Sequence, residues 1–265
     1  MNKPLGIIAI DLDGTLLDPQ GQYSIATRDY LRQLSSRGYA IVLATGRPFR
    51  AVKPIYEDLR LNAPVICYNG ALAFHPLDEG FPIIEAKFPK ETILEIYSLT
   101  LDLVDHYMAE SSDTVYINAP DEKLDHYFPY KGMNLREGDF RQTLNEDVFT
   151  LLFHTDKTEE LGQRLEGKFE NIGWRSWSGF GNSELFVPGA HKGTALLHIM
   201  EQLGLSKEDV YAFGDAPNDM EMLSVAGHPF AMKNNRSPHL LSRFPQTKNP
   251  VEEDGVLLTL KELLG

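Results

Sequence analysis

Short apolar runs alternate with helical patterns at both ends of this chain. Each run is rich in β-branched or aromatic residues and ends at a polar motif, which is typical of strands buried on both faces of a parallel sheet. The runs cover residues 5–10, 39–44, 65–68 and 210–213, and the helical patterns cover residues 24–37, 50–59, 193–203 and 219–226. This order of strands and helices predicts a doubly wound α/β fold with a parallel sheet.

The middle of the chain has a different composition. From about residue 87 to 185, Tyr, Trp and His become frequent, and turns rich in Pro and Gly separate short strand and helix patterns. We therefore predict a core domain made of residues 1–85 plus 186–265, with residues 86–185 inserted as an α+β cap. An insert that leaves the sheet at the carboxyl ends of its strands would cover a ligand there as a lid.

The charge balance narrows the classes of partner. The chain has 265 residues and a formal net charge of -13, which disfavours binding to nucleic acid and to anionic membranes, because both require Lys and Arg. A protein this acidic can still bind a phosphate ester if a metal ion and a few local cations reverse the field in the pocket. We therefore expect a divalent cation, and nothing in the sequence indicates an obligate protein partner.

Cysteine usage and hydropathy predict the compartment. The single cysteine, Cys67, cannot form an internal disulfide, and its place in an apolar run suggests a small core side chain. The sequence begins directly with a short strand pattern, and no run approaches the ~20 apolar residues of a membrane span. We predict a cytoplasmic protein.

The strongest local signal is Asp11-Leu12-Asp13-Gly14-Thr15, directly after the first apolar run. Two acids one residue apart cannot both enter a dry core without partners, but at the end of a strand they can share a metal ion. The carboxylate of Asp11 could attack phosphorus, and Asp13 could protonate the leaving oxygen and later activate water. The alternative is an ordinary turn, because Asp and Gly are common turn residues.

A second acidic segment, 214–219, follows the apolar run at 210–213. Mg²⁺ prefers an octahedral shell of oxygens with few carboxylates, so Asp11 and Asp215 could bind it together with the main-chain oxygen of Asp13. Asp219 is either a ligand, a support for the ligands or a helix cap. Asn218 would be a neutral contact to phosphate.

Five further residues could bind the substrate. Thr45 and Gly46 end the second strand pattern, where a hydroxyl and main-chain N–H groups can hold phosphate oxygens, although an ordinary turn would look similar. Lys192, at a helix start, could neutralise both the phosphate and the nucleophile, although most single lysines are only solvated. Arg47 and Asn69 could contact the rest of the ligand.

These motifs, in this order, resemble those of the haloacid dehalogenase-like hydrolases. The matching segments are Asp11-Leu12-Asp13-Gly14-Thr15, Thr45-Gly46-Arg47, Lys192-Gly193 and the Gly214-Asp215 to Asn218-Asp219 segment. The segment 69–71, the large insert and the closing 254–256 segment resemble the Cof-type phosphatase branch. His191 departs from the family pattern, because a small polar residue is more common before the lysine.

The resemblance implies a Rossmannoid core, a mobile cap, a requirement for Mg²⁺ and hydrolysis through an aspartyl phosphate. Carried over by position, it makes Asp11 the nucleophile, Asp13 the acid and base, Thr45 and Lys192 phosphate binders, Asp215 the metal carboxylate, Asp219 its neighbour, and Leu12 and Gly46 main-chain donors. Sugar phosphates are the favoured substrates, with flavin and pyridoxal phosphates as rivals. Two other functions stay open: a catalytically silent sensor of a phosphorylated metabolite, and a mutase that transfers phosphoryl groups.

Overall fold

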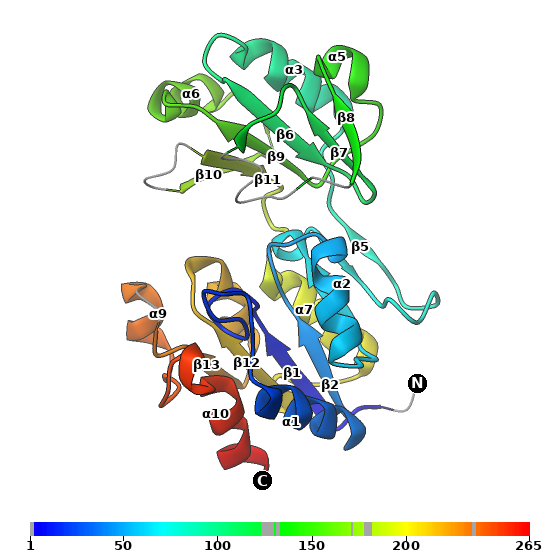
Figure 1. The fold of residues 1–265 in the computed structure, drawn as a ribbon, viewed down its shortest axis with the longest axis vertical. Helices are drawn as coiled ribbons and strands as arrows, with labels where there is room; N and C mark the ends of the chain where they lie inside the picture. Colours follow the sequence, from blue (N-terminus) through cyan, green and yellow to red (C-terminus); the bar gives the residue numbers. More distant parts are fainter. Residues whose placement is uncertain (1–2, 123–129, 131–132, 171, 178–181, 235–236) are drawn as a thin grey trace. The chain divides into compact units, whose positions relative to one another are not determined.

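The computed structural model describes all residues except 1–2, 123–129, 131–132, 171, 178–181 and 235–236. The chain divides into two compact units (Figure 1). Unit 1 consists of Met1–Glu85 and Ala190–Gly265, and unit 2 consists of Ala86–Gly189. None of the described helices combines the length and the apolar character that a bilayer span requires.

The core of unit 1 is a four-stranded parallel sheet with the order β13-β12-β1-β2. These strands are β1 (Gly6–Ile10), β2 (Tyr39–Leu43), β12 (Val210–Gly214) and β13 (His228–Ala231). A parallel bridge from Ala44 to Ile66 continues the sheet toward β3 (Val65–Cys67), where Cys67 is buried as expected. The predicted α/β fold with a parallel sheet is confirmed.

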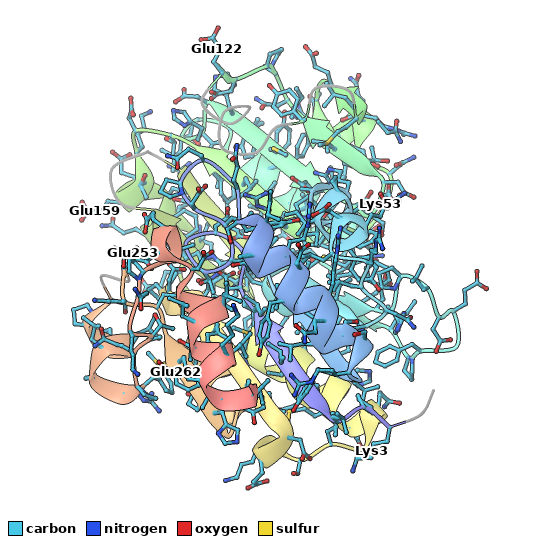
Figure 2. All side chains as sticks on the ribbon, turned by 60° about the horizontal axis from the view of Figure 1, so that its bottom comes forward. Lys3, Lys53, Glu122, Glu159, Glu253 and Glu262 are labelled. Atoms are coloured by element: carbon cyan, nitrogen blue, oxygen red, sulfur yellow. The ribbon has the colours of Figure 1, made fainter. Side chains whose placement is uncertain are left out.

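Helices cover both faces of this sheet because its side chains point alternately to opposite faces. Ile7 and Ala9 face one way and pack with apolar residues of α7 and α8. On the other face α1 and α10 lie side by side, as Figures 1 and 2 both show. The helices of unit 1 are α1 (Ile25–Ser36), α2 (Phe49–Asp58), α7 (Lys192–Leu203), α8 (Met220–Val225), α9 (Pro238–Arg243) and α10 (Gly255–Leu264).

Local signals explain where the helices begin and end. Ser24 caps α1, because its hydroxyl accepts a hydrogen bond from the Thr27 N–H at 3.0 Å. Helix α7 ends at Gly204, whose φ of 65° is the left-handed conformation that glycine adopts without strain. Acidic side chains such as Glu253 and Glu262 extend from the C-terminal segment, consistent with the negative net charge (Figure 2).

A small antiparallel sheet follows the core strands. It has the order β3-β4-β5, with β4 at Leu72–Phe74 and β5 at Ile84–Glu85. The turn between β3 and β4, Tyr68–Gly70, has positive φ at all three residues. A Cβ atom on Gly70 would lie 2.3 Å from the carbonyl carbon of His191, so glycine lets this turn approach the start of α7.

Unit 2 is built on a six-stranded sheet with the order β10-β11-β9-β6-β7-β8, in which only the β7–β8 pair is parallel among the described strands. The strands are β6 (His106–Glu110), β7 (Thr114–Ile117), β8 (Asn134–Glu137), β9 (Thr150–His154), β10 (Gly173–Trp177) and β11 (Asn182–Phe186). Helices α3 (Lys90–Thr100), α5 (Phe140–Thr143) and α6 (Thr158–Leu165) contribute side chains to the main apolar core of unit 2, next to Tyr107 and Phe153 of the sheet. Unit 2 therefore has a core of its own.

Candidate active site

The carboxyl ends of the core strands bring the acidic motifs together. Asp11 directly follows β1, and Asp215 directly follows β12, the neighbour of β1 in the sheet. Parallel strands end at the same edge, so the two loops meet although they are far apart in sequence. Carboxylate oxygens of Asp11, Asp215 and Asp219 lie within 4.8 Å of one another. We call these three residues the carboxylate cluster.

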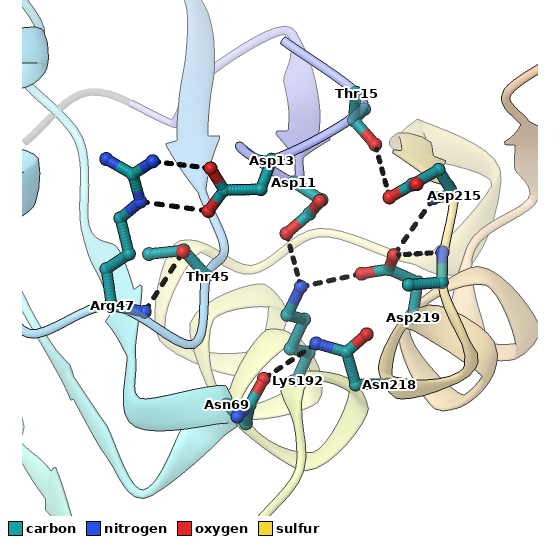
Figure 3. Close-up of polar contacts among 11 residues, drawn as sticks. Asp11, Asp13, Thr15, Thr45, Arg47, Asn69, Lys192, Asp215, Asn218 and Asp219 are labelled. Atoms are coloured by element: carbon teal, nitrogen blue, oxygen red, sulfur yellow. Dashed lines mark hydrogen bonds and ion pairs between the residues drawn. The ribbon is translucent and has the colours of Figure 1, made fainter. Parts of the chain in front are cut away.

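Lys192 provides the positive charge within the cluster (Figure 3). Its side chain is fully buried, and its Nζ atom lies 2.5 Å from Oδ1 of Asp11 and 2.7 Å from Oδ1 of Asp219. Burial alone would lower the pKa of the Lys192 ammonium, but the carboxylates of Asp11 and Asp219 outweigh it and raise that pKa. Lys192 is therefore a charged group inside the protein.

One ammonium does not balance three carboxylates. Burial, followed by repulsion from Asp219, raises the pKa of Asp215 to about 7. The same two causes raise the pKa of Asp11, against the opposing effect of Lys192. With all three groups ionised, the cluster would carry more negative charge than Lys192 neutralises, and oxygen ligands in this arrangement suit a hard divalent cation.

Asp219 connects the loop after β12 to Lys192. It is fully buried, and its Oδ2 accepts hydrogen bonds from the main-chain N–H groups of Asp215 at 3.0 Å and Ala216 at 3.1 Å. Its other oxygen, Oδ1, accepts from Lys192. Both oxygens of Asp219 thus hold protein groups in place, and its bond to the Ala216 N–H is a capping contact at the start of the short helix Pro217–Asp219.

The loop after β1 depends on glycine at position 14. Gly14 has a φ of 82°, and a Cβ atom there would lie 2.4 Å from Oδ2 of Asp215. Thr15 contributes a long hydrogen bond of 3.4 Å from its hydroxyl to Oδ1 of Asp215. Leu12 is buried, and its carbonyl accepts hydrogen bonds from the N–H groups of Leu16 and Leu17, so the loop turns tightly above the strand.

Asp13 does not join the carboxylate cluster. Its side chain is 59% exposed, and Arg47 binds both of its oxygens, with Nε 2.9 Å from Oδ2 and an Nη2 contact to Oδ1. Figure 3 shows this pair beside the cluster. The sequence suggested that Arg47 contacts a ligand, and in the structure its partner is Asp13.

The other predicted phosphate and ligand contacts lie near the second strand. Thr45 is buried, and its hydroxyl oxygen accepts the Arg47 main-chain N–H at 3.1 Å, so the hydroxyl hydrogen remains available for another acceptor. Gly46 approaches Asn69 closely, because a Cβ atom on Gly46 would lie 3.1 Å from the side-chain Nδ2 of Asn69. The Asn218 side-chain amide donates to Oδ1 of Asn69 at 2.8 Å, which links the acidic segment after β12 to the turn after β3.

Two residues at the site had a weak signal in the sequence. His191 is the N-cap of α7, because its Nδ1 accepts the Thr194 N–H at 3.1 Å. Asn234 donates to the Gly14 carbonyl at 2.9 Å and accepts from the Val251 N–H at 3.1 Å, so it ties the first loop to the C-terminal segment. The sequence marked His191 as a departure from the family pattern, but no local pattern indicated the hydrogen-bond partners of His191 or Asn234.

Comparisons with known proteins identify the family of the chain. A family model described as haloacid dehalogenase-like hydrolase matches residues 8–260. One 5-amino-6-(5-phospho-D-ribitylamino)uracil phosphatase of Bacillus subtilis is 32% identical over 263 residues, which cover 97% of this chain and 96% of that protein. The pyridoxal phosphate phosphatase of Escherichia coli is 29% identical over 245 residues, covering 86% and 88% of the two chains.

Solved structures give the same result. A crystal structure of a haloacid dehalogenase-like hydrolase from Bacteroides thetaiotaomicron has a TM-score of 0.85 and 26% identity, and covers 98% of this chain and 99% of its own. The chain therefore belongs to the haloacid dehalogenase-like hydrolases, in the Cof-type branch that the sequence resembles. It is an enzyme of the class that hydrolyses phosphoric monoesters.

Proposed function

We propose that this protein is a Mg²⁺-dependent phosphatase of small phosphate monoesters that forms a phosphorylated intermediate on Asp11. The observation that carries the proposal is the buried Asp11 carboxylate at the end of β1, held by the buried Lys192 inside the carboxylate cluster. A carboxylate fixed at the edge of the sheet can serve as a nucleophile if nearby cations offset the charge of the incoming phosphate.

The residues present fit a divalent cation. Asp11 and Asp215 would provide carboxylate oxygens, with the main-chain oxygen of Asp13 as a third protein ligand and Asp219 as a further or supporting one. The excess negative charge that the fully ionised cluster would carry supports this assignment. When bound, Mg²⁺ would neutralise charge on the phosphate oxygens.

The chain's own residues would carry out two displacements. An oxygen of Asp11 attacks phosphorus while the bond to the leaving oxygen breaks, and Asp13 donates a proton to that oxygen. A water molecule then attacks phosphorus, Asp13 takes its proton, and the bond to Asp11 breaks to release phosphate.

Several groups around Asp11 would hold the phosphate. Lys192 contributes charge, Thr45 its free hydroxyl hydrogen, and Leu12 and Gly46 main-chain N–H groups. Asn218 and Asn69, which already contact each other, would form the edge of the phosphate site.

We further propose that unit 1 is the catalytic core and that unit 2 is the cap that selects substrates. The independent core of unit 2 supports its assignment as a separate inserted domain. The named relatives act on a ribitylaminouracil phosphate and on pyridoxal phosphate, so the substrate class is a small phosphorylated metabolite. Sugar phosphates remain the first group to test, with flavin-related and pyridoxal phosphates beside them.

The test is replacement of Asp11 by Asn. With Mg²⁺ and p-nitrophenyl phosphate, we expect Asp11→Asn to lose at least about 10³-fold in kcat while remaining folded, because an amide is a poor nucleophile. Full activity in this variant would refute the role of Asp11. A panel of phosphate esters ranked by kcat/KM then separates the alternatives: tight binding without turnover indicates a sensor, and isomerised product without free phosphate indicates a mutase.

A further inference from the structure

The partner of Asp13 is an unexpected feature of the site. Arg47 engages both oxygens of Asp13 through Nε and Nη2, and the Asp13 side chain remains 59% exposed. Asp13 is absent from the group of carboxylates around Lys192. Asp13, the residue proposed to transfer protons, is therefore held by the guanidinium group of Arg47 beside the carboxylate cluster (Figure 3).

This pairing conflicts with proton transfer as long as it persists. A carboxyl group that donates a proton needs an oxygen that can carry it, whereas both oxygens of Asp13 accept hydrogen bonds from Arg47. The guanidinium group matches phosphate oxygens as well as it matches carboxylate oxygens. Arg47 can therefore exchange one anion for the other.

The main chain of Arg47 is fixed by hydrogen bonds, so a change of partner requires movement of its side chain only. The Arg47 N–H donates to the hydroxyl of Thr45 at 3.1 Å, and the Arg47 carbonyl accepts the Tyr68 N–H at 3.2 Å. Because Thr45 lies at the proposed phosphate site, the guanidinium group extends from a fixed point next to that site. Its side chain is 35% exposed, so a ligand can reach it.

We propose that Arg47 is a positioning residue that holds Asp13 back in the free enzyme and releases it when a phosphate group takes its place. The phosphate of the substrate competes with Asp13 for the guanidinium group, so binding of the correct chemical group frees the proton donor. This inference rests on the proposed function, because it takes Asp13 as the acid and base.

The test measures binding of inorganic phosphate in the presence of Mg²⁺ by calorimetry, which requires no turnover. Four proteins are compared: the unchanged chain, Asp13→Asn, Arg47→Met and the double variant. If Asp13 and phosphate compete for Arg47, Asp13→Asn lowers the Kd for phosphate about fivefold when Arg47 is present. This is the size expected for releasing a partly exposed ion pair. In the Arg47→Met background the same change shifts Kd by less than about twofold.

Equal tightening in both backgrounds would overturn the inference, because Asp13 would then repel phosphate without involving Arg47. The inference would also be overturned if Asp13→Asn did not tighten phosphate binding in the protein that keeps Arg47. The matched control is Asp29→Asn, which removes another exposed carboxylate paired with arginine, on α1, and should leave Kd unchanged. Unfolding by urea checks that each variant is folded.

Steady-state kinetics give a second readout. Arg47→Met should raise KM about tenfold and lower kcat by less than about threefold, because Asp13 is free in the substrate complex with or without Arg47. Arg47→Lys keeps the charge but not the two-point geometry, so its KM should lie between the KM of the unchanged chain and the KM of Arg47→Met. A kcat loss that exceeds the KM change would contradict the release of Asp13. Failure of the proposed function would appear separately, as absence of turnover in the unchanged chain.

Discussion

At the residue scale, the site depends on one buried ammonium group. Lys192 contacts two carboxylates and has no exposed surface, so it offsets charge that burial makes costly. The pair formed by Lys192 and Asp219 also fixes the loop that carries Asp215. Stability and the proposed chemistry therefore depend on the same side chain.

Replacing Lys192 by Met should lower the free energy of unfolding by about 3 kcal/mol, because Asp11 and Asp219 lose their buried partner. Chemical denaturation in the absence of Mg²⁺ measures this change. Lys207→Met is the control, because Lys207 is exposed and its Nζ lies as far as 4.0 Å from Oε1 of Glu208. It should change stability by less than about 0.5 kcal/mol. A similar loss in both variants would show that burial of the ion pair is not the cause.

Gly14 and Gly21 offer a matched pair at the same scale. Both have positive φ, 82° and 74°, but a Cβ atom would meet Asp215 at position 14 and nothing within 4 Å at position 21. Gly21→Ala should therefore cost about 1 kcal/mol from backbone strain alone. Gly14→Ala should cost more and also weaken Mg²⁺ binding, which calorimetry can measure. Equal Mg²⁺ affinity in the two variants would argue against the close approach.

At the element scale, the start of helix α7 matters because Lys192 is its first residue. The His191 side chain caps this helix through Nδ1, while Ser24 caps α1 in the same way through its hydroxyl. The two caps are chemically comparable, but only the first lies next to the carboxylate cluster. They allow the effect of a cap on stability to be separated from its effect on the site.

We expect His191→Ala and Ser24→Ala each to cost about 1 kcal/mol of stability, the usual value of an N-cap. Only His191→Ala should also lower kcat, by about tenfold, because the position of Lys192 depends on the first turn of α7. Thermal unfolding and steady-state kinetics on p-nitrophenyl phosphate test both statements. An unchanged kcat in His191→Ala would mean that the contacts with Asp11 and Asp219 position Lys192 without help from the cap.

At the scale of the whole molecule, charge dominates the response to conditions. The net charge is -13, and the carboxylate cluster concentrates part of it inside unit 1. A bound cation would remove this local excess, so stability should depend on metal and pH together.

Without metal, the raised pKa of Asp215, about 7, means that the folded protein binds more protons than the unfolded chain between pH 4 and pH 7. This contribution to stability is complete below the unfolded pKa and is lost as pH rises through about 7. Saturating Mg²⁺ should therefore raise Tm more at pH 8 than at pH 5. Scanning calorimetry with and without Mg²⁺ at the two pH values measures this difference, and an equal gain in Tm at both would contradict it.

The fold class and the identities of the motif residues could be predicted from local patterns in the sequence. Alternating strand and helix patterns depend on short-range periodicity, and the ends of parallel strands must share one edge, so Asp11 and Asp215 could be expected to meet. The same motifs indicated the similarity to phosphatases.

The partner that each polar group takes could be learned only from the three-dimensional packing of the chain. Asp13 could have joined the carboxylate cluster, yet it contacts Arg47, and Asp219 uses both oxygens on Lys192 and the loop main chain. His191 caps α7 although histidine carries little cap signal in a sequence. Hydrogen-bond partners depend on distances between segments far apart along the chain, and these distances are set by packing, which no local pattern encodes.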